Sequence, residues 1–117
     1  MWTLIKAVAL LRRNPALTPQ QFRDYWTNVH APMVKKLLPH LIKYTGSFPS
    51  ADPGSVRYVD RAEVDAVVEL GFPDRETMEA DMSAPAFQTE ERQKSSAYLM
   101  DMAATRSVVM EEIVVPL

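Results

Sequence analysis

The chain has no cysteine among its 117 residues, and this absence removes several kinds of chemistry. Disulfide bonds, metal sites built on thiolates and cysteine nucleophiles are all excluded. A protein without cysteine also fits a reducing compartment, in which disulfides do not form.

Glycine is scarce as well, with three residues, and no glycine-rich phosphate loop is present. Nucleotide binding is therefore disfavoured, and the G-x-S-x-G elbow of serine hydrolases is missing. The sequence contains no HxH, HExxH or EF-hand pattern, so we predict neither a metal nor another cofactor. The formal net charge is -2 and no run of Lys or Arg forms a basic stripe, which disfavours nucleic acid and anionic membranes as partners.

Long hydrophobic runs are also missing. The N-terminal stretch "MWTLIKAVALLRR" is interrupted by Lys6 and has its arginines after the apolar part, whereas a signal peptide carries its positive charge first. No segment approaches the length that spans a bilayer. We therefore expect a cytoplasmic protein that does not enter membranes.

What the chain does have is an ordinary globular composition, with 47% hydrophobic and 24% charged residues. A chain of this length is large enough for one core and too short for two. We expect a single domain over residues 1–117.

Four segments have the composition of β-strands, at residues 3–12, 42–48, 64–72 and 107–115. The first is apolar at both parities, so a strand at this position must be covered on both faces. A loop is expected at residues 49–55, "PSADPGS", which hold two prolines and a glycine.

Helices are expected between these strands. Thr18 fits an N-cap, followed by Pro19 and by Gln21 at the capping-box spacing, so a helix should run over residues 19–30. Pro32 should end or kink it, and a shorter helical piece should follow up to Pro39. Further on, we predict a short helix capped by Asp74 and a longer one over residues 83–102 capped by Ser83.

The order of elements is β-α-β-β-α-β, which is typical of the ferredoxin-like α+β fold: a four-stranded antiparallel sheet with helices on one face. The first strand is central in this arrangement. Because the helices cover only one of its two apolar faces, we expect another copy of the chain to cover the other. The prediction is a homodimer whose sheets pack face to face.

One stretch resembles a known family. "LTPQQFRDYWTNVHAP", followed by "LPHLIKY", is similar to the EthD domain, and its most specific part is Phe22, Tyr25, Trp26 and His30 with Pro32. The resemblance extends over essentially the whole chain and implies a dimeric α+β barrel. Relatives in that superfamily include cofactor-independent polyketide cyclases, muconolactone isomerases, small decarboxylases, quinone-forming monooxygenases and haem enzymes. A shared fold does not fix the reaction, so the function has to come from the site.

His30 is the principal candidate for that site. It lies at the edge of the apolar helix face, where a half-buried imidazole can exchange protons near neutrality and act as a general acid–base. The alternative is a structural histidine that hydrogen-bonds the free carbonyls of a helix end. Tyr25 and Tyr44 are the candidate hydroxyl donors to a developing oxyanion. His40, in a connecting loop, is expected to be exposed.

Aromatic residues are the candidates for substrate contact, although aromatics more often fill cores. They are Phe22, Trp26, Phe87 and Tyr98. Glu91 and Lys94 share a helix face with Tyr98, so the late helix either stands partly away from the core or lines a polar part of a cleft, and the first option is favoured. Asp101 resembles an acidic position of the family, but Ser95 and Ser96 stand nearby where acidic residues are expected, which leaves His30 without an obvious carboxylate partner.

The residues and the resemblance together predict a cofactor-independent enzyme of the lyase, isomerase or cyclase type, working in catabolism or polyketide-like metabolism. His30 would be the general acid–base, and the substrate would be a small aromatic, lactone or polyketide-like molecule in an apolar cleft between helices and sheet. One alternative is a non-catalytic dimeric module that binds a hydrophobic metabolite or assists a degradative enzyme. A cofactor-free monooxygenase is a further alternative.

Overall fold

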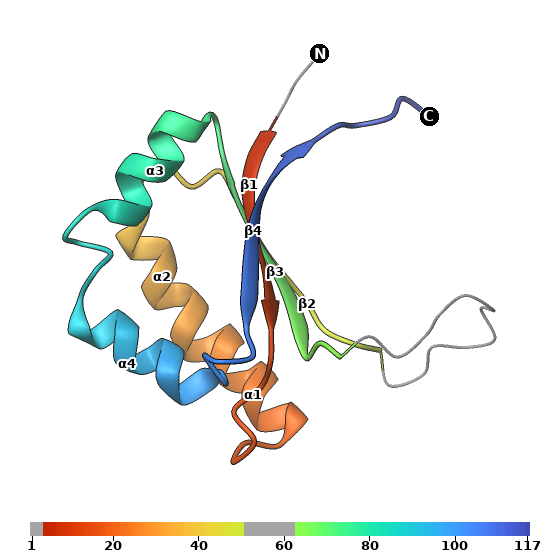
Figure 1. Ribbon diagram of the computed structural model, residues 1–117, viewed down its shortest axis with the longest axis vertical. Helices are drawn as coiled ribbons and strands as arrows, with labels where there is room; N and C mark the ends of the chain where they lie inside the picture. Colours follow the sequence, from red (N-terminus) through yellow and green to blue (C-terminus); the bar gives the residue numbers. More distant parts are fainter. Residues whose placement is uncertain (1–3, 51–62) are drawn as a thin grey trace.

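The sheet of this protein has four antiparallel strands, and a computed structural model describes them within residues 4–50 and 63–117 (Figure 1). The order across the sheet is β2-β3-β1-β4. The strands are β1 (Leu4–Leu11), β2 (Lys43–Ser47), β3 (Ala66–Phe72) and β4 (Arg106–Glu112). All four predicted strands and the ferredoxin-like arrangement are confirmed, with β1 in the interior of the sheet as expected. Most of the predicted loop at 49–55 lies outside the described residues.

The last strand is shorter than predicted. Glu112 pairs with Leu4, the first residue of β1, and the chain leaves the sheet after that pair. The expectation that the strand runs to residue 115 is therefore wrong. β-branched residues favour a strand only where a neighbouring strand accepts and donates their backbone hydrogen bonds.

The first helical region is longer and more continuous than expected. It consists of α1 (Pro19–Tyr25), the π-helical turn η1 (Trp26–His30) and α2 (Ala31–Leu37). The Thr18 cap is confirmed, including the reciprocal capping box with Gln21. Pro32, however, does not end the helix. The amide of Ala31 donates to the carbonyl of Trp26, a five-residue turn that widens the helix just where a proline ring would clash with the preceding turn.

The second helical region is divided into α3 (Arg75–Ser83) and α4 (Glu90–Leu99). Asp74 caps α3 as predicted, with its carboxylate 2.7 Å from the amide of Thr77. The predicted cap at Ser83 is wrong: Ser83 is the last residue of α3, and Thr89 caps α4 instead. Ala84 is extended because it precedes Pro85, and this geometry breaks the helix between the two.

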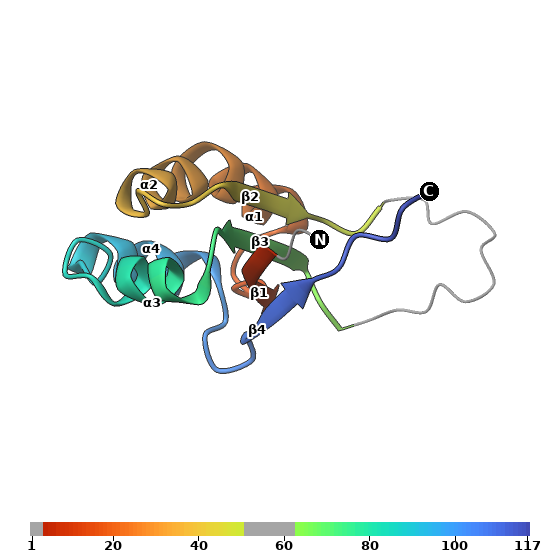
Figure 2. The ribbon, with the colours of Figure 1, turned by 90° about the horizontal axis from the view of Figure 1, so that it is seen from above.

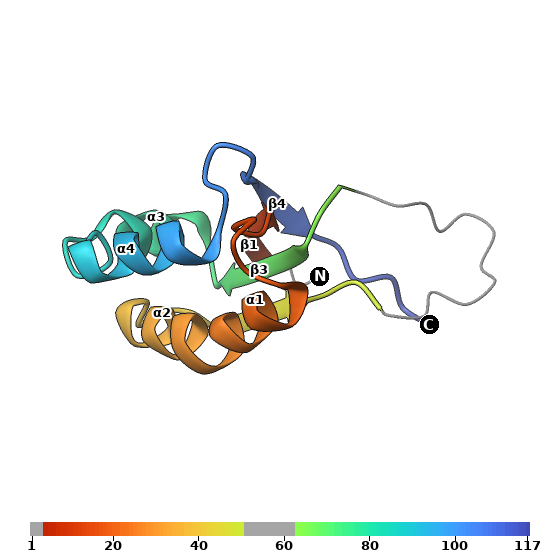
Figure 3. The same cartoon turned by 90° about the horizontal axis from the view of Figure 1, so that it is seen from below.

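The helices lie on one side of the sheet (Figure 1). Seen from above and from below, the α1–α2 rod and the α3–α4 pair lie side by side over that face (Figures 2 and 3). Apolar side chains fill the space between helices and sheet, and four of the large ones are less than 2% exposed: Phe22, Leu38, Phe72 and Leu99. Within the described residues, no helix is both long enough and apolar enough to cross a membrane.

The other face of the sheet carries no helix among the described residues, and it is mixed in character. Val8 is buried on it, while Leu10, Val108 and Met110 are more than 40% exposed. It also carries a charged group that extends across the strands, which we call the sheet-face charge cluster, formed by Lys6, Lys43, Glu69 and Glu112. Lys6 pairs with both glutamates, and Lys43 lies 3.3 Å from Glu112. Lys6 and Glu69 thus pair across the neighbouring strands β1 and β3.

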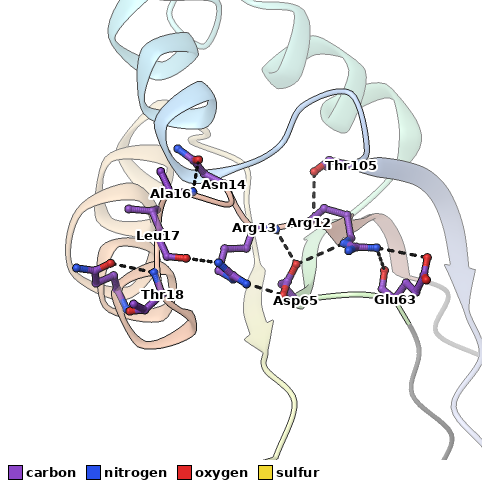
Figure 4. A network of polar contacts seen from close by, with 10 residues as sticks. Arg12, Arg13, Asn14, Ala16, Leu17, Thr18, Glu63, Asp65 and Thr105 are labelled. Atoms are coloured by element: carbon purple, nitrogen blue, oxygen red, sulfur yellow. Dashed lines mark hydrogen bonds and ion pairs between the residues drawn. The ribbon is translucent and has the colours of Figure 1, made fainter.

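A polar network ties the end of β1 to the start of β3 (Figure 4). The Asp65 carboxylate accepts from the amide of Arg13 at 2.7 Å and lies 3.4 Å from Nε of Arg12. The Arg13 guanidinium also donates to the carbonyl of Leu17, immediately before the Thr18 cap. These contacts fix the loop that leads into α1, and so they help to set the position of the helical rod on the sheet.

Candidate active site

His30 lies at the end of η1 and turns toward α4. Its ring is buried, with 7% of the residue exposed, and its Nδ1 atom is 2.8 Å from the Ser95 hydroxyl. The same hydroxyl is 3.0 Å from the phenol oxygen of Tyr25. Ser95 therefore bridges His30 and Tyr25, and we refer to these three residues as the hydroxyl–imidazole cluster.

The charge state of His30 follows from its surroundings. Burial, together with the nearby Arg92 guanidinium, lowers the pKa of His30 from 6.5 to about 4, with burial as the larger cause. The imidazole is consequently neutral at physiological pH. Ser95 shares a hydrogen bond with it without supplying the negative charge that would stabilise the protonated form.

A cleft of about 350 Å³ opens beside this cluster. Ser95 and Tyr25 line it, whereas His30 is not among its lining residues and contacts Ser95 from behind. The remaining lining residues are Val29, Met33, Glu91, Lys94 and Tyr98. All of these residues belong to the helices, so this cleft lies between the α1–α2 rod and α4. This cleft therefore differs from the predicted one, which was expected between helices and sheet.

Trp26, at the other end of η1, turns away from the cluster toward β2. A Cβ atom on Gly46 would lie 2.6 Å from the Trp26 ring, so the absence of a side chain there makes room for the indole. Tyr44 packs edge-on against Trp26 at 5.5 Å between ring centroids. Both residues line a second groove, of about 630 Å³, between the helical rod and β2. The structure thus does not bring Tyr44 to His30, although the sequence predicts both as members of one site.

The other predicted contact residues are divided between core and cleft. Phe22 is buried at 1% exposure, and Phe87 is buried with the Arg92 guanidinium 4.3 Å above its ring. Tyr98 does reach the cleft, where its ring packs edge-on against Tyr25 at 4.6 Å. Of the four aromatic residues predicted to contact substrate, Tyr98 is the one that lies beside the hydroxyl–imidazole cluster.

The charged residues of α4 lie at the rim of the cleft. Lys94 is exposed and 2.9 Å from Glu90, one turn earlier on α4. Glu91 also lines the cleft. Glu91 and Lys94 are therefore exposed to solvent and also line a cleft. Both options that the sequence left open for the late helix apply.

Ser95 is the residue of this site that the sequence did not identify. Its position stands out in the sequence only because a serine is present there instead of an acidic residue. Asp101, the acidic candidate, instead accepts hydrogen bonds from the amides of Ala103 and Ala104 in the turn after α4. The available signal was a polar residue on the buried side of α4. A serine that is buried in a helix usually has a hydrogen-bonding partner, so its presence there indicates a polar contact.

His40 is exposed, as predicted, and it also has a structural partner. Its side chain is 57% exposed, while its Nδ1 and backbone amide each lie 2.8 Å from the buried carboxylate of Asp81. This pair fixes the loop before β2 to α3. Residues 4–50 and 63–117 contain no group of three or more histidine and carboxylate side chains placed to hold a metal ion.

The hydroxyl–imidazole cluster is suited to moving a proton. Each of its three members can both donate and accept through its hydroxyl or imidazole group. Tyr25 and Ser95 line the cleft, and the imidazole behind them is the strongest base of the three. No covalent step is required of any of them.

Comparison with known proteins places the chain in a family. The EthD domain family model matches residues 14–102, which include the whole helical rod, β2, β3 and α4. The chain belongs to the EthD family. No curated protein matches it.

The solved structures similar to this EthD protein share its fold at low sequence identity. An EthD family protein from Bacillus halodurans is 18% identical, with a TM-score of 0.71 over 94% of this chain and 99% of that one. A dimeric ferredoxin-like protein of unknown function from Thermobifida fusca is 19% identical, with a TM-score of 0.56 over 96% and 92%. SnoaB, a cofactor-independent oxygenase from Streptomyces nogalater, is 10% identical, with a TM-score of 0.55 over 100% and 97%. At these low sequence identities, the similarity is evidence for a shared fold and not for a shared reaction.

Proposed function

We propose that this EthD protein is a cofactor-independent enzyme that moves protons on a small aromatic, lactone or polyketide-like substrate, in a reaction of the lyase, isomerase or cyclase type. The observation that carries this proposal is the Ser95 hydroxyl, 2.8 Å from His30 and 3.0 Å from Tyr25 beside an open cleft. A neutral base connected to a cleft by two hydroxyls is a route for a proton.

The proposed step begins with Tyr25 donating to Ser95 and Ser95 donating to Nδ1 of His30. An acidic C–H or O–H of the substrate passes its proton to the Tyr25 oxygen, Tyr25 passes its own to Ser95, and Ser95 passes its own to His30. The substrate becomes an enolate or phenolate, His30 becomes imidazolium, and both hydroxyls are restored. The reverse transfer returns the proton to another atom of the substrate, which completes an isomerisation, a cyclisation or a lyase reaction.

The low pKa of His30 bears directly on this step. Protonating His30 in the empty site costs about 3 kcal/mol more than protonating free imidazole, because its pKa is near 4 and not 6.5. A substrate anion held next to the cluster would offset this cost by Coulomb attraction, which is strong away from bulk water. His30 would therefore become an effective base only when substrate is bound.

The cleft favours a small and partly aromatic substrate. Tyr25, Tyr98, Val29 and Met33 supply apolar and aromatic surface, while Lys94 at the rim can attract an anionic oxygen. The cleft volume of about 350 Å³ lies at the lower end of the range for small-molecule sites. Substrates of one or two rings fit this description.

Deuterium exchange tests the proposal and does not require the product to be identified. The protein is incubated in D2O with a panel of phenols, lactones and 1,3-diketones, and loss of C–H signals is followed by NMR. We expect exchange of at least one compound, with His30→Gln lowering the rate about 100-fold and Ser95→Ala also slowing it. Ser96→Ala is the matched control, since Ser96 is equally buried on the neighbouring position of α4 but contacts Arg92. Exchange that is equal in His30→Gln and wild type contradicts the proposal.

Oxygenation is a second candidate, supported by the fold shared with SnoaB and with an antibiotic biosynthesis monooxygenase homologue from Caulobacter crescentus. The same proton removal would produce an electron-rich phenolate or enolate, which can react with molecular oxygen as the oxidant. Consumption of oxygen together with substrate, measured with an oxygen electrode, distinguishes this reaction from isomerisation.

Non-catalytic binding of a hydrophobic metabolite, or assistance to a degradative enzyme, is the remaining alternative. It has the support of the resting state of His30, which is a poor base when the cleft is empty. Under this alternative, ligands from the panel bind to wild type and to His30→Gln, but no proton exchange occurs in either protein.

We further propose that the protein is a homodimer that associates through the open face of the sheet. Val108, Met110 and Leu10 are exposed there, which is unusual for a face of a stable monomer. The Thermobifida fusca relative is described as dimeric, which supports the same state here. Sedimentation analysis should show a dimer, and Val108→Arg should shift it toward monomer while circular dichroism stays unchanged. A wild-type monomer at all concentrations contradicts this part of the proposal.

A further inference from the structure

The C-terminal segment after β4 is apolar and exposed. Ile113 and Val114 are each 68% exposed, Val115 is 70% exposed, and Leu117 is the last residue of the chain. The segment leaves the sheet on the side opposite to the helices (Figure 1). Four of these five successive residues have apolar side chains that nothing within residues 4–50 and 63–117 covers, and such a segment gains stability by docking.

The second groove of the molecule has apolar side chains along part of its lining, together with Thr27, Lys35 and Lys43. It has a volume of about 630 Å³ and lies between α2 and the outer edge of β2, with Trp26, Leu38, Leu41, Ile42 and Tyr44 among its lining residues. β2 pairs with β3 on one side, and its other edge is a free edge within the described residues. A groove beside a free strand edge can receive an extended segment, which forms main-chain hydrogen bonds and inserts alternate side chains.

The register of the sheet shows how a second copy would bring the segment to this groove. Lys43 at the start of β2, Lys6 in β1 and Met110 near the end of β4 lie in one row across the sheet, so β2 begins and β4 ends at the same side. In a face-to-face dimer, a two-fold axis parallel to the strands places the β4 edge of one copy over the β2 edge of the other.

This arrangement has the correct strand directions. Such an axis preserves the direction of every strand, and β2 and β4 run in opposite directions within one sheet. The partner's β4 would therefore lie antiparallel to β2. Its C-terminal segment would leave the sheet beside Ile42 and Lys43, at the mouth of the groove.

We propose that residues 113–117 of one copy dock into the groove between α2 and β2 of a second copy, and that the exchange is reciprocal. This inference rests on the proposed homodimer and adds the segment and the groove that lock it. Five extended residues span roughly 16 Å, enough to lie along the start of β2 and into the groove. A two-fold axis perpendicular to the strands would place β4 over β4 and leave both the groove and the segment exposed.

The lack of cysteine allows a direct crosslinking test. Val115→Cys and Ile42→Cys are prepared as separate proteins, mixed, and oxidised mildly, so that a disulfide between the two variants can form only between copies. We expect a covalent heterodimer in high yield. Ser47→Cys, exposed at the far end of β2, is the matched control and should crosslink to Val115→Cys weakly. Equal yields with Ile42→Cys and Ser47→Cys, or no crosslink with Ile42→Cys, overturn the proposal.

Removal of residues 113–117 tests the energetic part. The shortened protein should keep its circular dichroism and remain able to dimerise, with a dissociation constant raised at least about tenfold, which corresponds to about 1.4 kcal/mol. An unchanged dissociation constant overturns the docking of the segment while leaving the sheet-face dimer intact. A wild-type protein that never dimerises overturns the homodimer itself, and with it this inference.

Discussion

The two sides of this sheet place ionisable side chains in opposite environments. On the helical side, the His30 imidazole is buried next to hydroxyl groups, and burial keeps it neutral. On the open side, Lys6, Lys43, Glu69 and Glu112 contact one another as ions, and the Lys6 hydrogen bond lowers the pKa of Glu69 while the Glu69 hydrogen bond raises that of Lys6. A titratable group keeps its charge in a partly buried place when an opposite charge is supplied, and loses it when only dipoles are supplied.

This difference separates two roles. The uncharged site on the helical side can take up a proton when a substrate anion arrives, so it suits proton chemistry. The charge cluster on the open side is already balanced, with two lysines and two glutamates. Such a cluster is unsuited to proton transfer, but it can orient two sheets against each other, because mispaired charges at an interface are unfavourable.

The largest expected effect comes from acidifying the helical side. Above pH 6.5, His30 is neutral in both the folded and the unfolded chain. Between pH 6.5 and about 4, the unfolded chain binds a proton that the folded chain does not, so the free energy of unfolding falls by up to about 3 kcal/mol. Urea unfolding at pH 7, 5.5 and 4.5 should show this loss in wild type, and His30→Gln should lack it. Parallel pH profiles for the two proteins would refute the neutral buried state.

Breaking the charge cluster should have the next largest effect. Lys6→Met leaves Glu69 without its principal counter-charge, and we expect a loss of about 1 to 2 kcal/mol, between the values for exposed and buried ion pairs. Glu69 should then titrate at a higher pH in NMR experiments. Adding 0.5 M NaCl should reduce the gap between Lys6→Met and wild type, because salt screens partly exposed ions. The same salt should leave the His30 titration nearly unchanged, which is the control.

The smallest effect is expected from adding a negative charge next to His30 on the helical side. Ser95→Asp places a carboxylate next to Nδ1 of His30, and the pKa of His30 should rise by up to one unit, equal to about 1.4 kcal/mol. NMR titration of the His30 ring measures the shift directly. Ser96→Asp is the matched control on the adjacent position, which faces Arg92, and it should move the His30 pKa less. Equal shifts in the two variants would show that proximity to Ser95 is not what sets the charge of His30.

The fold was largely predictable from the sequence, because its signals are local and strong. The Thr18 and Asp74 caps and the two apolar parities of β1 each depend on residues close in the chain. Two of the errors occurred where tertiary structure decides the outcome. The π-helical turn that accommodates Pro32 has no reliable sequence signature, and the pairing of Glu112 with Leu4 determines where β4 ends.

The site was less predictable, since it depends on which helix faces which. His30 and Tyr25 do meet, but through Ser95, which lies 65 residues from His30 in the chain. The choice of partner for a histidine at that separation follows from helix packing. Tyr44 lies apart from His30 because it belongs to β2, where it packs against Trp26 at the opposite end of η1.

The π-helical turn also bears on how this family can tolerate insertions and deletions. A π-helical turn holds one residue more than the corresponding α-helical turn, so losing one residue from 26–30 would convert the rod to a regular α-helix. Because the wider turn already accommodates the extra residue, α2 would keep nearly its present orientation relative to α1 after such a deletion. What would change is the spacing within the turn, between Trp26, which packs over Gly46, and His30, which contacts Ser95. The length of this short segment, as much as its composition, therefore decides whether the two ends of η1 reach the groove and the cleft at once.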